Sequence, residues 1–339
     1  KDQTVYIWKT SNFSKKHSLI SHTGTVNSLP WSKDGEKLLS ASADGSLRKW
    51  DLQEPFEVHY EVCDYGPWQL PLNKDNSLFA APCSDKHIAL YQISNGEMLH
   101  DFEGPSGLCG DISEDGKYLV TAGFDGIVRL WDIQKGEPKC TLEGHTTRVD
   151  GVAYLDETGQ IVSVGDTTLR VWDVATNKAI KIVSFNEHPF RVVASPDESS
   201  VYVGFSSGSV KVIQTNTWKE ITHFSADAGR NELAISPNGD YLAIFQKEHI
   251  EIRDALTGAL RYHFKDHEKT GYGIGFSPDS RYLISGSYDQ TFKLWNLERG
   301  LCTLTFHGID ANIYRTEILD EKRIILSTSQ GGIFYYDFR

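Results

Sequence analysis

The chain has 339 residues, 39% of them apolar, which is enough to bury a large core. Its 46 acidic residues outnumber its 34 basic residues and give a net charge of −12, which argues against nucleic acid or an anionic membrane as the main partner. The five cysteines are scattered without a CxxC pair, which favours free thiols in a reducing, intracellular compartment, and no apolar run approaches the roughly 18 residues that span a bilayer.

From the N-terminus onwards, short stretches of alternating apolar and polar residues recur at a fixed interval. Nine of these stretches can be aligned by their last residue, which is most often an aromatic one. The end residues are Trp8, Trp50, Tyr91, Trp131, Trp172, Ile213, Arg253, Trp295 and Tyr336. Successive end residues are 40 to 42 positions apart. Alternation of period two predicts β-strands, and no segment has the three-to-four spacing of a long amphipathic helix. The sequence therefore predicts an all-β fold of propeller blades with four strands each.

Residues 273–306 show the order of elements inside one repeat. A short apolar strand is followed by a Ser-Pro-Asp-Ser turn at 277–280, and a second strand leads to a turn at Asp289. A third strand ends in Trp295, and a turn at 298–300 leads into a fourth strand. Turn residues every 8 to 12 positions are typical of antiparallel strands joined by short hairpins.

These repeats resemble the WD40 family. The resemblance rests on Gly144-His145, on the Trp-Asp dipeptides at 50–51, 131–132 and 172–173, and on hairpin turns such as "SKDGEKLLSAS" and "SPDSRYLISGS". It covers nearly the whole chain. It implies a closed β-propeller of four-stranded antiparallel blades, usually seven and sometimes eight.

The number of blades depends on how the two ends of the propeller meet. The chain contains a third and a fourth strand, then seven full repeats, then a final repeat of three strands. We expect the strand at 16–20 to complete the final repeat, which gives eight blades, with seven as the alternative. Residues 1–9 would then be a leftover third strand of an upstream repeat, and residues 10–339 a propeller in the C-terminal part of a longer protein.

The WD40 resemblance also implies a His–Ser/Thr–Asp–Trp network that braces individual blades. Three sets are complete and one lacks the histidine, because Pro105 takes its place; the residues are His22, Ser40, Asp44 and Trp50; His145, Ser163, Asp166 and Trp172; His267, Ser285, Asp289 and Trp295; and Thr121, Asp125 and Trp131. A buried indole N–H and a buried hydroxyl each need a partner, and histidine and aspartate can supply them. The same residue types suit a catalytic triad, but an enzyme needs one set whereas bracing should recur, so we predict a structural role.

Two other patterns favour structural roles over ligand binding. The glycine-rich stretch 271–277 resembles a phosphate-binding loop, but no helix follows it, so we expect its glycines to allow close packing near the propeller axis. No two of the 12 histidines have HxH spacing, and the one HxxxH pair, His263 and His267, is accounted for by an outer strand and by the bracing network, so the sequence predicts no metal site and no cofactor. Distant ligands could still be brought together by the fold.

In the WD40 family partners usually bind the face that carries the turns between second and third strands and the loops between blades. Aromatic residues and arginine are typical of binding hot spots, although each could equally be a packing residue. The candidates on this face are Tyr65, Trp68, Phe124, Arg148, Phe190, Arg230, Tyr272 and Tyr288.

We therefore predict a non-enzymatic scaffold that binds protein or peptide partners, or other domains of the same chain. One alternative is the C-terminal sensor propeller of a signalling NTPase, which would restrain the NTPase until a ligand binds. Another is a propeller enzyme, which would bring acidic or histidine side chains together at one mouth of the central channel. Neither nucleic-acid binding nor membrane insertion is expected.

Overall fold

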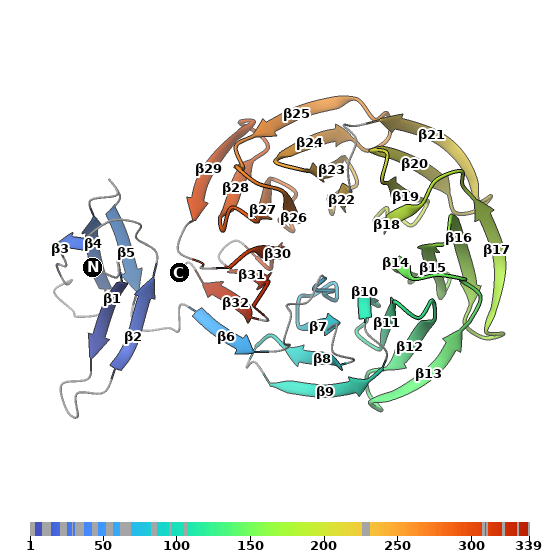
Figure 1. Cartoon of the computed structure of the whole chain (residues 1–339), viewed down its shortest axis with the longest axis horizontal. Coiled ribbons are helices and arrows are strands. Elements are labelled where there is room, and N and C mark those ends of the chain that lie inside the picture. The colour runs from blue at the N-terminus through green and yellow to red at the C-terminus, as the bar shows by residue number, and fades with distance from the viewer. Residues whose placement is uncertain are drawn as a thin grey trace.

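The computed structural model describes residues 4–8, 15–20, 26–28, 30, 37–42, 47–51, 57–61, 69–82, 87–94, 97–104, 107–225, 231–306, 309, 311–320, 323–330 and 332–337. Every regular element assigned within these residues is a β-strand, so the predicted all-β class is confirmed. Among the same residues there is no helix long and apolar enough to cross a membrane. Figure 1 shows seven sheets arranged as blades around a common centre.

Five of the sheets in the described part of the chain have four consecutive antiparallel strands, ordered from the centre outwards. The first two consist of β10 (Gly107–Ile112), β11 (Tyr118–Gly123), β12 (Val128–Asp132) and β13 (Glu137–Leu142), then β14 (Val149–Leu155), β15 (Gln160–Gly165), β16 (Thr168–Asp173) and β17 (Lys178–Ser184). The next two consist of β18 (Pro189–Ala194), β19 (Ser200–Phe205), β20 (Ser209–Gln214) and β21 (Lys219–Ser225), then β22 (Asn231–Ile235), β23 (Tyr241–Gln246), β24 (His249–Asp254) and β25 (Leu260–Lys265). The fifth consists of β26 (Gly271–Phe276), β27 (Tyr282–Ser287), β28 (Phe292–Asn296) and β29 (Leu301–Phe306).

Two further sheets stand where the first and last strands of the seven blades lie side by side (Figure 1). One has three strands, β7 (Leu78–Pro82), β8 (His87–Gln92) and β9 (Met98–Glu103), and an isolated bridge from Leu72 to Phe79 takes the place of a first strand. The other joins β30 (Ile313–Ile318), β31 (Arg323–Thr328) and β32 (Gly332–Asp337) to β6 (Glu57–Glu61) from the N-terminal part of the chain.

The prediction of eight blades is not supported, because the strand that completes the last sheet is β6 and not the strand at 16–20. An unpaired outer edge on β32 would be a site for aggregation, and β6 covers that edge directly before the chain enters the β7–β9 sheet. Leu319 and Ile325 of the last sheet pack in one apolar cluster with Phe79 and Ala81 of the β7–β9 sheet. The last sheet and the β7–β9 sheet therefore share one apolar cluster.

The remaining N-terminal strands lie beside the seven blades (Figure 1). β1 (Thr4–Trp8) pairs with β2 (Lys15–Ile20), while β3 (Val26–Ser28), β4 (Lys37–Ser42) and β5 (Leu47–Asp51) form a separate sheet. The strand at 4–8, which had no partner in the predicted eight-bladed arrangement, therefore has one here.

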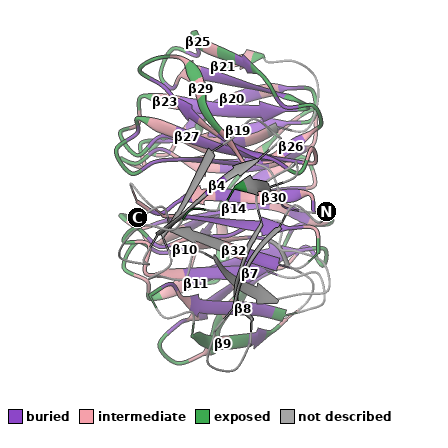
Figure 2. Ribbon diagram, turned by 90° about the vertical axis from the view of Figure 1, so that its left-hand side faces the viewer, coloured by how far each residue is buried: buried purple, intermediate pink, exposed green. Residues whose placement is uncertain are grey.

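Apolar side chains from neighbouring sheets form the core between them. Trp131 packs against the β7–β9 sheet, Trp172 against the β10–β13 sheet, and Trp295 against the β22–β25 sheet. Outer strands such as β9 and β25 leave most of their residues exposed, as Figure 2 shows. Each tryptophan therefore joins its own blade to the preceding one.

Residues 271–276 of the glycine-rich stretch form β26, and the glycines allow β30 to approach closely. A Cβ atom added to Gly273 would lie 2.9 Å from the backbone nitrogen of Thr316, and one added to Gly275 would lie 2.8 Å from the Thr316 carbonyl oxygen. Both contacts are shorter than a methyl group tolerates, and backbone atoms cannot move aside as a flexible side chain can. These glycines therefore serve packing between two innermost strands.

Candidate functional site

The network around Trp172 is a continuous chain of hydrogen bonds within the β14–β17 sheet. The indole Nε1 of Trp172 donates to the Ser163 hydroxyl at 2.8 Å, and that hydroxyl lies 2.7 Å from Nε2 of His145. Nδ1 of His145 lies 2.9 Å from the carboxylate of Asp166, which also accepts from the Thr146 amide at 2.7 Å. Each buried polar atom of this hydrogen-bond network therefore has a partner.

The protonation states follow from these contacts. Burial lowers the pKa of His145, so the imidazole is neutral; its Nδ1–H donates to Asp166, and its Nε2 accepts from Ser163. Burial alone would raise the pKa of Asp166, but hydrogen bonds from Thr168, Thr146 and His145 lower it to about 2. The carboxylate is therefore ionised at neutral pH and holds the histidine in one orientation.

Ser163, His145 and Asp166 lie within the distances of a Ser-His-Asp triad, but Ser163 is not placed for catalysis. The serine is fully buried, and its hydroxyl oxygen already accepts the Trp172 N–H. A nucleophile must reach its substrate and must present its oxygen to it. This geometry braces the blade.

The β26–β29 sheet repeats the same network with nearly the same distances. Trp295 donates to Ser285 at 2.8 Å, His267 contacts Ser285 at 2.8 Å through Nε2, and its Nδ1 lies 2.8 Å from Asp289. Although burial opposes it, the hydrogen bonds from His267 and Thr291 hold the pKa of Asp289 well below its usual range. Recurrence in two blades agrees with a structural role.

The β10–β13 sheet keeps part of this arrangement without a histidine. Trp131 donates to Thr121 at 2.8 Å, while Asp125 pairs with Arg129 at 2.7 Å in the turn between β11 and β12. Of the N-terminal set, Ser40 is buried in β4 and Trp50 lies on β5 with its side chain outside the described residues, as are His22 and Asp44.

The candidate face is the end of the propeller where innermost strands begin and second strands end. Gly271 at the start of β26 pairs with Ser287 at the end of β27, so Tyr272 and Tyr288 lie at this end. By the same register Phe124, Arg148 and Phe190 lie there too. The other candidates, Tyr65, Trp68 and Arg230, lie outside the described residues.

Phe124 is the most exposed of the described candidates, with 55% of its surface accessible. Its turn is fixed by Gly126, which has a φ of +75°, and a Cβ atom there would lie 2.7 Å from the Thr147 carbonyl oxygen. The Asp125–Arg129 ion pair closes the same turn. The phenyl ring is therefore presented to solvent by a rigid support.

Tyr288 belongs to a cluster of three tyrosines from two adjacent blades. Its ring centroid lies 5.1 Å from that of Tyr272 and 5.8 Å from that of Tyr314. Burial and the contacts with both neighbours raise the pKa of Tyr288, so its hydroxyl stays protonated at neutral pH. Tyr314 was not among the residues predicted for this face.

Arg148 and Phe190 meet between two other adjacent blades, β14–β17 and β18–β21. The guanidinium carbon of Arg148 lies 5.8 Å from the Phe190 ring centroid, and its Nε lies 3.0 Å from a carboxylate oxygen of Asp150. The other carboxylate oxygen of Asp150 lies 2.8 Å from Nε2 of His188, whose ring contacts Phe190. Asp150 and His188 extend the candidate face.

Charged residues on three innermost strands neutralise one another. Nε of Arg191 on β18 donates to Glu232 on β22 at 2.8 Å, and Arg315 on β30 donates to the same carboxylate at 3.3 Å. Arg315 also donates to Glu317 at 3.0 Å; burial raises the pKa of Glu317, and the nearby arginines oppose that shift. Glu232 and Glu317 are acidic side chains of the kind that a channel enzyme would need, but both carboxylates already accept hydrogen bonds from arginines.

Asp111 on β10 joins two neighbouring blades. Its carboxylate accepts from the Ile112 amide at 3.0 Å and from the Tyr154 amide on β14 at 2.9 Å. Burial raises the pKa of Asp111 to about 7, although both amide hydrogen bonds act in the opposite direction.

Replacing Asp111 by asparagine should therefore change how stability depends on pH. The folded-state pKa lies above the ordinary value of 3.8, so between about pH 4 and 7 the folded protein holds a proton that the unfolded protein has lost. The free energy of unfolding of the wild type therefore falls as the pH rises through that window. The free energy of unfolding of the variant, relative to that of the wild type, should therefore be about 2 kcal/mol higher at pH 7.5 than at pH 5. Urea unfolding of both proteins at the two pH values measures this difference, and a constant difference would contradict the assignment.

The fold also brings together three potential metal ligands that the sequence did not connect. In the described part of the chain, His249, Glu251 and His263 form one such group, with their ligand atoms within 4.8 Å of one another. They come from β24 and β25, and no sequence spacing joins His249 to His263.

Comparison with known proteins agrees with the repeat pattern and the geometry. Four segments, residues 13–51, 96–132, 136–173 and 258–296, match the family described as "WD domain, G-beta repeat". The chain contains WD40 repeats. The blades β18–β21 and β22–β25 fall largely outside the matched segments, and they are the blades in which Ile213 and Arg253 replace the tryptophan.

This WD40 protein is similar to two groups of curated relatives. It is 27% identical over 270 residues to the serine-threonine kinase receptor-associated proteins of Homo sapiens and Rattus norvegicus, covering 77% of this chain and 75% of each relative. It is 25% identical over 321 residues to striatin of Homo sapiens, covering 87% of this chain but 37% of striatin. WD40 propellers are in general scaffolds that bind proteins.

Proposed function

We propose that this WD40 protein is a non-catalytic platform that binds a protein or peptide partner through the candidate face. The observation that carries the proposal is Phe124, an aromatic side chain more than half exposed on a turn that Gly126 and the Asp125–Arg129 ion pair hold in place. Binding to a preformed aromatic anchor does not require the loop to be ordered at the moment of association, so less of the interaction energy is lost.

The neighbouring residues add further contacts suited to a polypeptide. The Tyr272–Tyr288–Tyr314 cluster offers ring faces and hydroxyl groups, and Arg148 lies over Phe190 with its charge partly balanced by Asp150. Aromatic residues and arginine dominate protein-binding hot spots. The name of the serine-threonine kinase receptor-associated protein describes an association with another protein, which supports the same class of function for this chain.

Replacing Phe124 by alanine should weaken partner binding without weakening the fold. Because the ring is exposed, the free energy of unfolding should change by less than about 0.5 kcal/mol. Loss of a hot-spot anchor should cost about 2 kcal/mol of binding, or roughly a thirtyfold loss of affinity. The measurement is a comparative pull-down from native extract, followed by titration of the captured protein.

Ile182→Ala is the matched control, because Ile182 is a comparably exposed apolar residue on the outer strand β17. A partner lost with Phe124→Ala and retained with Ile182→Ala would support the candidate face. A partner that Ile182→Ala releases and Phe124→Ala retains would place the binding surface on the outer strands and overturn the proposal.

A further inference from the structure

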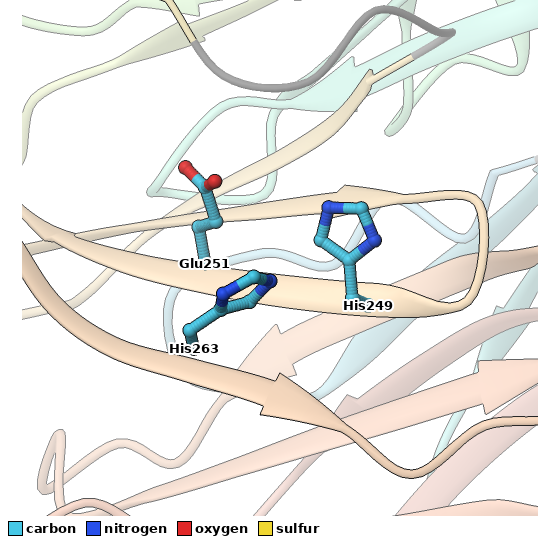
Figure 3. A group of neighbouring side chains, drawn as sticks. All are labelled: His249, Glu251 and His263. Carbon is cyan, nitrogen blue, oxygen red and sulfur yellow. The ribbon is translucent and has the colours of Figure 1, made fainter.

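His249, Glu251 and His263 form a compact polar group on the outer half of the β22–β25 blade. Glu251 on β24 is paired directly with His263 on β25, and His249 lies two residues before Glu251, so alternation places all three on one side of the sheet. Figure 3 shows the three side chains projecting from that side. The two imidazole centroids are 4.9 Å apart.

This group occupies one of the blades that have lost the bracing network. Arg253 stands at the tryptophan position, and it donates to Glu251 at 2.7 Å, to the Gly258 carbonyl at 2.8 Å and to the Ser225 carbonyl at 3.1 Å. His249 and Glu251 are each only 6% exposed, whereas His263 is exposed. Two potential ligands are therefore held in place by burial, and the third lies beside solvent.

Two imidazoles and one carboxylate are a donor set that zinc accepts, with a fourth position left for water or another ligand. Arg253 contacts one carboxylate oxygen of Glu251 and leaves the other available, which is the arrangement by which outer hydrogen bonds orient a ligating carboxylate. We propose that His249, Glu251 and His263 bind a zinc ion.

The geometry is close to that of a zinc site. Ligand atoms about 2.0–2.2 Å from zinc can be at most about 4.4 Å apart, and the ligand atoms here all lie within 4.8 Å of one another. His263 has room to turn because it lies on the exposed side of the outer strand. The positive charge of Arg253 opposes the metal, and its bonds to two backbone carbonyls hold it in place beside Glu251. Magnesium and calcium prefer all-oxygen sites and should not compete.

The test is a zinc titration of the metal-free, untagged full chain by calorimetry. We expect the wild type to bind one zinc ion per chain, and binding to weaken by at least about tenfold in His263→Ala and in Glu251→Gln. Zinc should also raise the Tm of the wild type and not that of His263→Ala. Magnesium should produce neither effect.

His223→Ala is the matched control. His223 lies on β21 in the position that His263 takes on β25, but it is paired opposite Lys211 and contacts Glu220 at 2.9 Å. This variant should bind zinc as the wild type does. A wild type without saturable zinc binding, or a His263→Ala protein that binds zinc as tightly as the wild type, would overturn the proposal. Because His263 is exposed, its loss should leave folding intact even if Glu251→Gln does not fold.

Discussion

Replacing Trp172 by alanine should lower the free energy of unfolding by about 3–5 kcal/mol, because the substitution leaves a large cavity. The indole is 1% exposed and lies in the core between the β10–β13 and β14–β17 sheets. It also donates the hydrogen bond that fixes Ser163, so its loss removes a partner from the whole network. Urea unfolding followed by circular dichroism measures the effect.

Trp172→Phe separates the two contributions. It keeps most of the apolar volume and removes the N–H donor, so it should cost about 1–2 kcal/mol. If Trp172→Ala unfolds at the same urea concentration as the wild type, the tryptophan does not brace the blade.

Replacing Glu232 by alanine should also cost about 3–5 kcal/mol, because it leaves two arginines without their shared carboxylate. Arg191 has only 9% of its side chain exposed, and Arg315 has 15%. A buried charge that loses its partner retains the full cost of leaving water, which exceeds the attraction that the pair gained. Urea unfolding again provides the measurement.

The Arg281–Glu298 pair supplies the comparison, since both side chains are more than half exposed at a separation of 3.1 Å. Glu298→Ala should cost less than about 1 kcal/mol. The double variant Arg191→Ala/Glu232→Ala should cost less than the sum of the two single variants. Equal losses from Glu232→Ala and Glu298→Ala would show that the innermost charges are not coupled.

The repeating strands were predictable because they depend on local alternation. Trp131, Trp172 and Trp295 mark third strands in sequence and in structure, and Ile213 and Arg253 mark them too although the tryptophan is lost. Alternation and turn chemistry act over a few residues, so replacing one end residue leaves the strand intact.

The number of blades was not predictable from the period. The edge of β32 could in principle accept either the strand at 15–20 or β6, because both are strands of five or six residues that mix polar and apolar side chains. The choice depends on packing between β30–β32 and the β7–β9 sheet, where Leu319 and Phe79, 240 residues apart in the sequence, belong to one apolar cluster. Repeat spacing contains no information on that contact.

The candidate sites were likewise predictable only where their residues follow a local sequence pattern. His145, Ser163 and Asp166 come from one blade and follow a local pattern, whereas Glu232 and Arg315 are 83 residues apart and meet only through the fold. His249 and His263 likewise come from adjacent strands without a recognisable spacing. Residues joined across strands and blades could be found only once the register of the strands was known.

Amide hydrogen exchange of the protein with its captured partner tests the central claim most directly. Binding through the candidate face should slow exchange at residues 123–127 and 287–291, which form turns between second and third strands, and leave the outer strands β13 and β17 unchanged. Slower exchange confined to β13, β17 or another outer strand, with the turns at Phe124 and Tyr288 unaffected, would contradict the account.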